Sequence, residues 1–180
     1  MPSFDDSEVV LVDENDRQVG VAGKLAAHQN GARLHRAFSV CLFNSKGEML
    51  LQQRTMTKYH SKGKWSNTCC SHPTPSESII EASHRRLREE LGIDVPKLED
   101  IFSFIYRVDV GDGLTEHEYD HVVFGRFDGL PKPNPEEVMD YKWMKSEDLR
   151  DDIKAHPDRY TGWLRIAIDR IIAEQRKSHY

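Results

Sequence analysis

The residues with the most evident chemistry are a thiol and an imidazole two positions apart, Cys70 and His72. They lie in the segment Asn67-Thr68-Cys69-Cys70-Ser71-His72-Pro73. Thiols and imidazoles are side chains that transfer protons or bind metal ions when their surroundings adjust their pKa values. The segment is therefore a candidate site, and the neighbouring Cys69 adds a second thiol whose part in it the residues alone leave open.

Two carboxylates and two further histidines are candidate metal ligands. Glu116 and Glu118 project from the same face of a predicted strand, because side chains alternate along a strand. His28 and His35 lie upstream in the chain. Taken singly, a histidine is more often packed or exposed than bound to metal, and paired glutamates more often form a solvated strand face. Their spacing alone leaves both interpretations open.

A charged helix follows the thiol segment. Its end, residues 85–93 (RRLREELGI), with Glu77 eight residues before Arg85, resembles the Nudix box. In that box, carboxylates near one end of a helix hold a divalent cation, which in turn binds a diphosphate. Two positions depart from it: Ser71 replaces the first glycine, and Arg86 replaces the first glutamate. Arginine inverts the local field and suits phosphate oxygens, so we expect a diphosphate-binding helix that lacks part of the equipment for hydrolysis.

The elements that position these residues follow from periodicity. The Glu77–Leu91 segment has apolar residues at three- and four-residue steps and ends at Gly92, which predicts a helix. A second helix is predicted at Trp163–Gln175. Turn-forming residues 13–16, after the Val9–Val12 segment, predict an N-terminal hairpin, residues 44–47 predict a second, and Gly111-Asp112-Gly113 predicts a third. The predicted strands are Val9–Val12, Ala37–Phe43, Met49–Gln53, Ile101–Val110, Glu116–Phe127 and Val138–Met144. This order indicates an α+β or α/β sandwich.

Length and composition narrow the classes of protein. A chain of 180 residues is expected to form one domain, 1–180. The net charge of -5 argues against a nucleic-acid-binding protein, and no apolar run reaches the length of a membrane span. The acidic segment Met1–Glu8 gives no sign of a signal peptide, and three cysteines fit free thiols in a reducing compartment. We therefore expect a soluble cytoplasmic protein without membrane insertion.

Taken together, the motifs resemble those of the type I isopentenyl-diphosphate delta-isomerases of the Nudix superfamily. The resemblance covers nearly the whole chain and rests on several separated motifs in one order: residues 33–39 (RLHRAFS), Asn67-x-x-Cys70-x-His72-Pro73, the altered Nudix box, Glu116-x-Glu118, and residues 137–143 (EVMDYKW). It implies a Nudix-like α+β fold, an α/β/α sandwich with a mixed central sheet, one Nudix-box helix and a C-terminal helix. It also implies a reversible 1,3-allylic proton shift between isopentenyl and dimethylallyl diphosphate through a carbocation, in isoprenoid biosynthesis.

The resemblance further assigns roles to residues. One divalent ion, Mn²⁺, Mg²⁺ or Zn²⁺, would be held by His28, His35, His72, Glu116 and Glu118. A second, Mg²⁺, would lie between the diphosphate and Glu90, with Glu89 as the rival ligand. The diphosphate would be bound by Lys24, Arg54, Lys58 and Arg86. The acid–base pair would be Cys70 and Glu118, assisted by Tyr106, with Trp163 facing the carbocation.

Two other functions remain open at this level. A Nudix hydrolase of a nucleoside diphosphate derivative would use the same helix, and a non-catalytic domain could bind an isoprenoid diphosphate without turning it over. Arg86 and the Cys70–His72 pair favour the isomerase. The expected partner is a small isoprenoid diphosphate, and the expected assembly is a monomer or weak homodimer.

Overall fold

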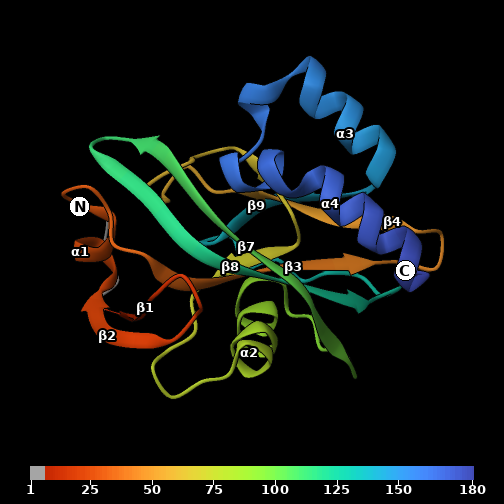
Figure 1. The fold of residues 1–180 in the computed structure, drawn as a ribbon. Coiled ribbons are helices and arrows are strands. Elements are labelled where there is room, and N and C mark those ends of the chain that lie inside the picture. Colours follow the sequence, from red (N-terminus) through yellow and green to blue (C-terminus); the bar gives the residue numbers. More distant parts are fainter. Residues whose placement is uncertain (1–6) are drawn as a thin grey trace.

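The structure, a computed structural model, describes residues 7–180. One mixed sheet lies between helix α2 on one face and helices α3 and α4 on the other (Figure 1). The strands are β1 (Glu8–Val12), β2 (Gln18–Gly23), β3 (His35–Phe43), β4 (Glu48–Arg54), β5 (Trp65–Ser66), β6 (Cys69–Ser71), β7 (Leu98–Gly111), β8 (Leu114–Arg126) and β9 (Val138–Lys145). The helices are α1 (Lys24–His28), α2 (Ile79–Leu91), α3 (Ser146–Ala155) and α4 (Gly162–Ser178), with a 3₁₀ turn at Pro157–Arg159.

The central strands β3 and β8 run parallel, and β7 forms a hairpin with β8. In this register His35 lies opposite Glu118, and Glu118 lies opposite Tyr106. Three chemically active side chains from distant parts of the sequence are thus placed side by side by strand pairing.

The predicted hairpin after β3 forms, but β3 and β4 pair only next to the turn, at Phe43 and Met49. Beyond that point the two strands separate. Strand β3 continues beside β6 and β8, while β4 pairs with β5 and β9.

Two apolar cores lie on the two faces of the sheet. Val40 and Leu42 of β3 pack in the core beneath α2, whereas Cys41 and Phe43 pack in the core beneath α3 and α4. Because β3 is covered on both faces, its burial is nearly continuous and its sequence is apolar instead of alternating.

Helix α2 begins at Ile79, two residues later than predicted. Ser78 caps it: its Oγ accepts a hydrogen bond from the Glu81 N–H, and the Glu81 carboxylate accepts one from the Ser78 N–H. The helix ends at Leu91, as predicted, because Gly92 adopts φ 60° in the left-handed region that glycine tolerates best.

The other predicted strands and the C-terminal helix are confirmed within a few residues, whereas α1, α3, β5 and β6 were not predicted. These four elements are short, so their sequences carry little periodicity. None of the helices within residues 7–180 is long and apolar enough to cross a membrane. The predicted absence of a signal peptide concerns residues 1–8, of which 1–6 lie outside the described residues.

Candidate active site

A cavity of about 50 Å³ is lined by residues of the sheet and by Lys58, Tyr59 and His60 of the loop that joins β4 to β5. Eleven of the thirteen predicted site residues line it, and the exceptions are His28 and His35, which are fully buried. The eleven are Lys24, Arg54, Lys58, Cys70, His72, Arg86, Glu90, Tyr106, Glu116, Glu118 and Trp163. A wider groove of about 1160 Å³ shares Lys24, Lys58 and Arg86 with the cavity, so these cations lie where the two spaces meet.

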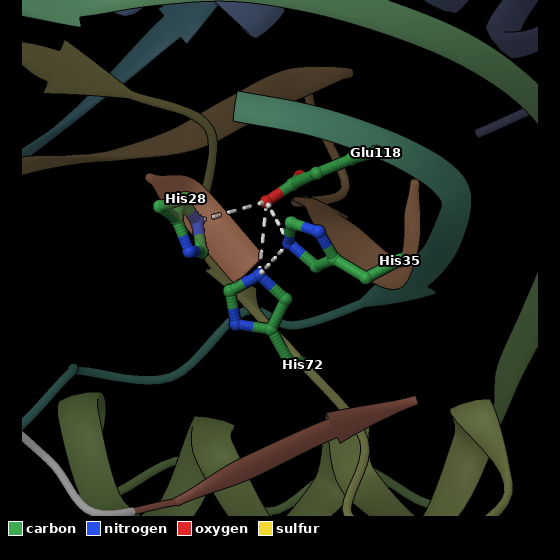
Figure 2. A group of neighbouring side chains, drawn as sticks. All are labelled: His28, His35, His72 and Glu118. Carbon is green, nitrogen blue, oxygen red and sulfur yellow. Dashed lines mark hydrogen bonds and ion pairs between the residues drawn. The ribbon is translucent and has the colours of Figure 1, made fainter. Parts of the chain in front are cut away.

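Three imidazoles gather around one carboxylate, as Figure 2 shows. The Glu118 Oε1 atom lies 2.9 Å from His72 Nε2, 3.4 Å from His35 Nε2 and 4.0 Å from His28 Nε2. The Nε2 atoms of His35 and His72 are themselves only 3.2 Å apart. Two imidazole nitrogens held so close, facing one carboxylate oxygen, form an arrangement typical of ligands around a cation.

Hydrogen bonds set the tautomers of two of these rings. His28 Nδ1 lies 2.6 Å from the Lys24 carbonyl oxygen and His35 Nδ1 lies 2.8 Å from the Arg33 carbonyl oxygen, so each Nδ1 carries the proton it donates. This leaves Nε2 with a lone pair in the neutral ring. The fully buried His28 Nε2 has no hydrogen-bond partner among the described residues. An unpaired buried acceptor at this position fits a metal ligand.

The charge states agree with metal binding. Burial lowers the pKa of His28 and lowers that of His72 to about 3, so both rings are neutral near pH 7. Burial acts to raise the pKa of Glu118, but its interactions with the His35 and His72 rings outweigh burial and hold the pKa well below its usual value. The cluster thus offers neutral imidazoles and an ionised carboxylate, the forms that bind divalent cations.

Glu116 lies in a second, adjoining group. Its Oε1 atom is 3.2 Å from His60 Nε2, and His28, His60 and Glu116 together could hold a cation. Tyr106 joins the two groups, since its hydroxyl lies 2.5 Å from Glu118 Oε2 and 3.0 Å from Glu116 Oε2. His60 is the residue that sequence reasoning missed: no motif marks it, and only the return of residues 55–64 to the sheet brings it here.

Cys70 and Cys69 lie on opposite faces of β6. Cys69 is fully buried in the core beneath α2, whereas Cys70 lines the cavity. The Cys70 thiol donates a hydrogen bond to Asn67 Oδ1 at 2.9 Å and accepts one from Trp163 Nε1 at 2.9 Å. Burial, reinforced by the nearby Asp120 carboxylate, raises the pKa of Cys70 to about 12. The side chain is therefore a protonated thiol near pH 7.

Comparison with known proteins identifies the family. Residues 33–164 match the NUDIX domain family. An isopentenyl-diphosphate Delta-isomerase 2 of Aromatoleum aromaticum is 52% identical over 93% of this chain and 88% of its own length. An isopentenyl-diphosphate Delta-isomerase 2 of Photorhabdus laumondii is 50% identical over 91% of this chain and 92% of its own length. An isopentenyl-diphosphate Delta-isomerase of Pectobacterium atrosepticum is 47% identical over 92% of this chain and 91% of its own length. The chain belongs to the isopentenyl-diphosphate Delta-isomerase family.

Solved structures agree with the fold of this isomerase family member. The crystal structure of a Deinococcus radiodurans protein has a TM-score of 0.76 at 22% identity, covering 91% of this chain and 98% of that one. The MutT protein of Methanosarcina mazei has a TM-score of 0.65 at 20% identity, covering 82% and 96%. At such identities the likeness concerns the fold alone, and together with the NUDIX match it confirms the predicted Nudix-like α+β class.

The cationic side of the isomerase cavity carries the altered Nudix box. Arg86 Nη2 donates to Glu90 Oε1 and Arg86 Nη1 donates to Glu89 Oε2, both at 2.6 Å. Glu90 is buried and lines the cavity, whereas Glu89 is exposed and lines the outer groove. The arginine therefore occupies the space in front of the box carboxylates. Arg86 thereby places a fixed cation beside these carboxylates, where it can bind the oxygens of an anion.

Two further cations lie near Arg86. Lys58 forms an ion pair with Glu137, and burial is the main cause that lowers the pKa of Lys58 to about 8. Arg54 packs over the ring of Trp163, 5.6 Å from its centre. The Nε atoms of Arg54 and Arg86 are buried and have no hydrogen-bond partner within residues 7–180. Unpaired guanidinium donors facing a cavity provide hydrogen bonds that an anion can accept.

Proposed function

We propose that the chain catalyses the reversible conversion of isopentenyl diphosphate to dimethylallyl diphosphate. The observation that supports this most strongly is the convergence of a protonated thiol, Cys70, and a carboxylate–tyrosine pair, Glu118 and Tyr106, on one small cavity. The high identity to isopentenyl-diphosphate Delta-isomerases supports the same substrate.

The substrate would enter with its hydrocarbon end first. The cations Lys24, Lys58 and Arg86 line both the cavity and the outer groove, so the diphosphate would remain at this boundary. Mg²⁺ would neutralise the diphosphate further, with Glu90 as the protein ligand, because Mg²⁺ is commonly bound through one carboxylate and substrate phosphates. Fixed cations at one end orient the five-carbon chain toward Cys70 and hold it there.

The proton shift requires two groups that act at different carbons. One of Cys70 and Glu118 delivers a proton to the terminal methylene carbon, which leaves a positive charge on the adjacent tertiary carbon. The other removes a proton from C2, and the double bond moves there with the electron pair of the broken C–H bond. Protons balance over the reaction, since one is added and one is lost.

The carbocation needs protection while it exists. The Trp163 indole lines the cavity, and its N–H donates to Cys70 Sγ, so the ring lies against the reacting thiol. The electron-rich face of an indole stabilises a desolvated cation by about 2 kcal/mol or more. A narrow cavity also excludes the water that would trap the cation as an alcohol.

A divalent metal would be held by His28, His35, His72, Glu116 and Glu118. Nitrogen-rich ligation favours a transition metal such as Mn²⁺ or Zn²⁺ over Mg²⁺. When bound, the ion supplies positive charge that keeps the Glu118 carboxylate ionised and fixed in direction. Tyr106 holds the other carboxylate oxygen, so the orientation of Glu118 is set from both sides.

Incubation with isopentenyl diphosphate in D₂O, with Mg²⁺ and Mn²⁺ present, tests the proposal. We expect NMR to show dimethylallyl diphosphate with deuterium in a methyl group, and an assay for released phosphate to stay at background. A Nudix hydrolase would instead release phosphate or a nucleotide from a nucleoside diphosphate derivative. A binding domain would retain isopentenyl diphosphate without hydrogen exchange, and either result would refute the proposal.

A further inference from the structure

We propose that Asn67 is a positioning residue that holds the Cys70 thiol and the Trp163 indole in fixed places relative to each other. The inference rests on the proposed isomerisation, in which the thiol and the indole act on the substrate. Asn67 is 1% exposed and is not among the residues within 7–180 that line the cavity, so it acts through these two neighbours.

Asn67 lies where the sheet divides. Residues 67–68 join β5, which pairs with β4, to β6, which pairs with β3. Strands β3 and β4 pair beside their turn and then separate, so this short connection crosses from one to the other. Buried polar groups at such a crossing need hydrogen-bond partners within the protein, and the Asn67 amide finds them in two directions.

The orientation of the Asn67 amide is fixed by two backbone acceptors. Its Nδ2 atom donates to the Val40 carbonyl oxygen at 2.9 Å and to the Cys69 carbonyl oxygen at 3.1 Å. A carbonyl oxygen accepts hydrogen bonds and cannot donate one, so the amide nitrogen and not the amide oxygen must face these two groups. Oδ1 is therefore left to accept from the side chains around Cys70.

Three side-chain donors converge on Asn67 Oδ1. The Cys70 thiol donates at 2.9 Å, the Ser66 hydroxyl at 3.0 Å and the Trp163 Nε1–H at 3.2 Å. The Trp163 Nε1–H also lies 2.9 Å from Cys70 Sγ, so the amide oxygen, the thiol and the indole form a closed triangle. Asn67 thereby sets both the direction of the S–H bond and the place of the indole beside the sulfur.

The same triangle joins helix α4 to the site. Trp163 is in the first turn of α4, and the residue before that helix is docked on β5. The Thr161 N–H donates to the Trp65 carbonyl oxygen at 3.0 Å, and Thr161 Oγ1 lies 3.1 Å from Ser66 Oγ. Because Trp163 comes from a distant part of the chain, its bond to Asn67 is one of the contacts that fix the ring. Loss of that bond would let the ring turn away from the reacting carbon chain.

A purely structural role is the competing explanation, since Asn67 also joins β3 to β6 through Nδ2. The two roles use different atoms: Nδ2 bonds to the backbone, and Oδ1 bonds to the thiol and the indole. Asn67→Asp separates them, because a carboxyl oxygen can still accept at the Oδ1 position while the Nδ2 donors are lost. Asn67→Ala loses both.

Thr68→Val is the matched control, because Thr68 is the other buried residue of the same connection. Its Oγ1 accepts from the Leu42 N–H at 2.9 Å and donates to the Leu50 carbonyl oxygen at 2.7 Å, which joins β3 to β4. Valine keeps the shape of the side chain and removes these bonds. The variant should unfold at a lower urea concentration than wild type, yet keep the wild-type kcat and the wild-type indole signal of Trp163.

The experiment measures isomerisation by the full chain with Mg²⁺ and Mn²⁺, and records indole ¹⁵N–¹H spectra in which Trp163→Phe assigns the signal. Asn67→Ala should lower kcat by about 10- to 100-fold and leave KM nearly unchanged, because misplacing reacting groups by about 1 Å costs about 100-fold. It should also shift the Trp163 Nε1 signal, since one of the two acceptors is lost. Asn67→Asp should lose less kcat and keep that signal near its wild-type position.

An unchanged kcat or an unchanged indole signal in Asn67→Ala would overturn the proposal. Equal losses of kcat in Asn67→Ala and Thr68→Val would overturn it too, because they would mark the effect as structural. So would an Asn67→Asp variant whose indole signal moves as far as that of Asn67→Ala.

A measurement on the wild-type protein covers the case in which the variants do not fold. Both Asn67 Nδ2 protons should exchange slowly with D₂O, because each is held by a buried carbonyl. Fast exchange would refute the orientation on which the proposal depends. The NMR readouts do not require turnover, so failure of the proposed reaction and failure of this inference are distinguishable.

Discussion

Replacement of Tyr106 by phenylalanine tests how Glu118 is controlled. The change removes one hydroxyl from a buried ring and preserves the ring's shape. The hydroxyl has a single proton, and it lies closer to Glu118 Oε2, at 2.5 Å, than to Glu116 Oε2, at 3.0 Å. The substitution therefore deprives the Glu118 carboxylate of its strongest neutral donor and leaves the metal ligands in place.

The magnitude follows from the energy of such a bond. A hydrogen bond to a charged group contributes about 1.5–3 kcal/mol. Its loss removes a bond to the ionised form and therefore raises the pKa of Glu118. If that energy is needed to orient and stabilise the carboxylate in the transition state, kcat falls by about 10- to 150-fold. KM should change little, because the hydroxyl belongs to the Glu116–Glu118 side of the cavity and not to the cationic boundary.

The assay is the steady-state rate of dimethylallyl diphosphate formation at saturating isopentenyl diphosphate, measured across pH. Tyr119→Phe is the matched control: it removes a hydroxyl from the opposite face of β8, where Ser103 Oγ donates to it at 3.3 Å, and should retain wild-type kcat. A Tyr106→Phe enzyme with wild-type kcat, or one that loses only substrate affinity, would refute the reasoning.

Three further predictions address other parts of the molecule. Cys70→Ala should abolish turnover while Cys69→Ala retains most of it, because only the former side chain lines the cavity; the reverse pattern in rate assays would show that the wrong thiol was chosen. Arg86→Gln should raise KM by about 10- to 100-fold, through loss of charged hydrogen bonds to the diphosphate, without phosphate release; an unchanged KM would remove Arg86 from the binding site. Burial acts to lower the pKa of His121, but its two flanking aspartates together outweigh burial and raise the pKa, so the charged form of His121 stabilises the fold. That stabilisation is complete below the unfolded-state pKa of about 6.5 and is lost as pH rises through the folded-state pKa. In urea unfolding, the free energy of unfolding of the wild type should therefore exceed that of His121→Gln at low pH and lose this excess at high pH. A difference in unfolding free energy that stays constant with pH would contradict this prediction.

Much of the fold follows from local patterns. The Nudix-box helix has its apolar period, its glycine stop and a charged face within one segment, so its identity could be predicted. Its start could not, because the Ser78–Glu81 capping box begins the helix two residues inside the predicted range. The strands β7 and β8 are long and β-favouring, so they too were predicted closely. Helix α3 was missed because its core contacts, Leu149 and Ile153, are too few to establish a period.

The site was harder to derive from local sequence. Glu118, His35 and Tyr106 meet because of the register of three strands, which no local pattern encodes. The resemblance to known isomerases supplied that information instead. His60 had no such support, since its place depends on how the loop after β4 returns to the sheet. The distinction between the two adjacent thiols likewise depends on how β6 pairs with β3.

The central claim is that Cys70 and Glu118 act on the substrate from two sides of one cavity. A crystal structure with an unreactive isopentenyl diphosphate analogue, Mg²⁺ and Mn²⁺ tests it most directly. We expect the five-carbon chain between the thiol and the carboxylate, the diphosphate beside Arg86, and the anomalous signal of Mn²⁺ among the imidazoles. A hydrocarbon chain lying in the outer groove, or a thiol and a carboxylate on the same side of it, would contradict the account.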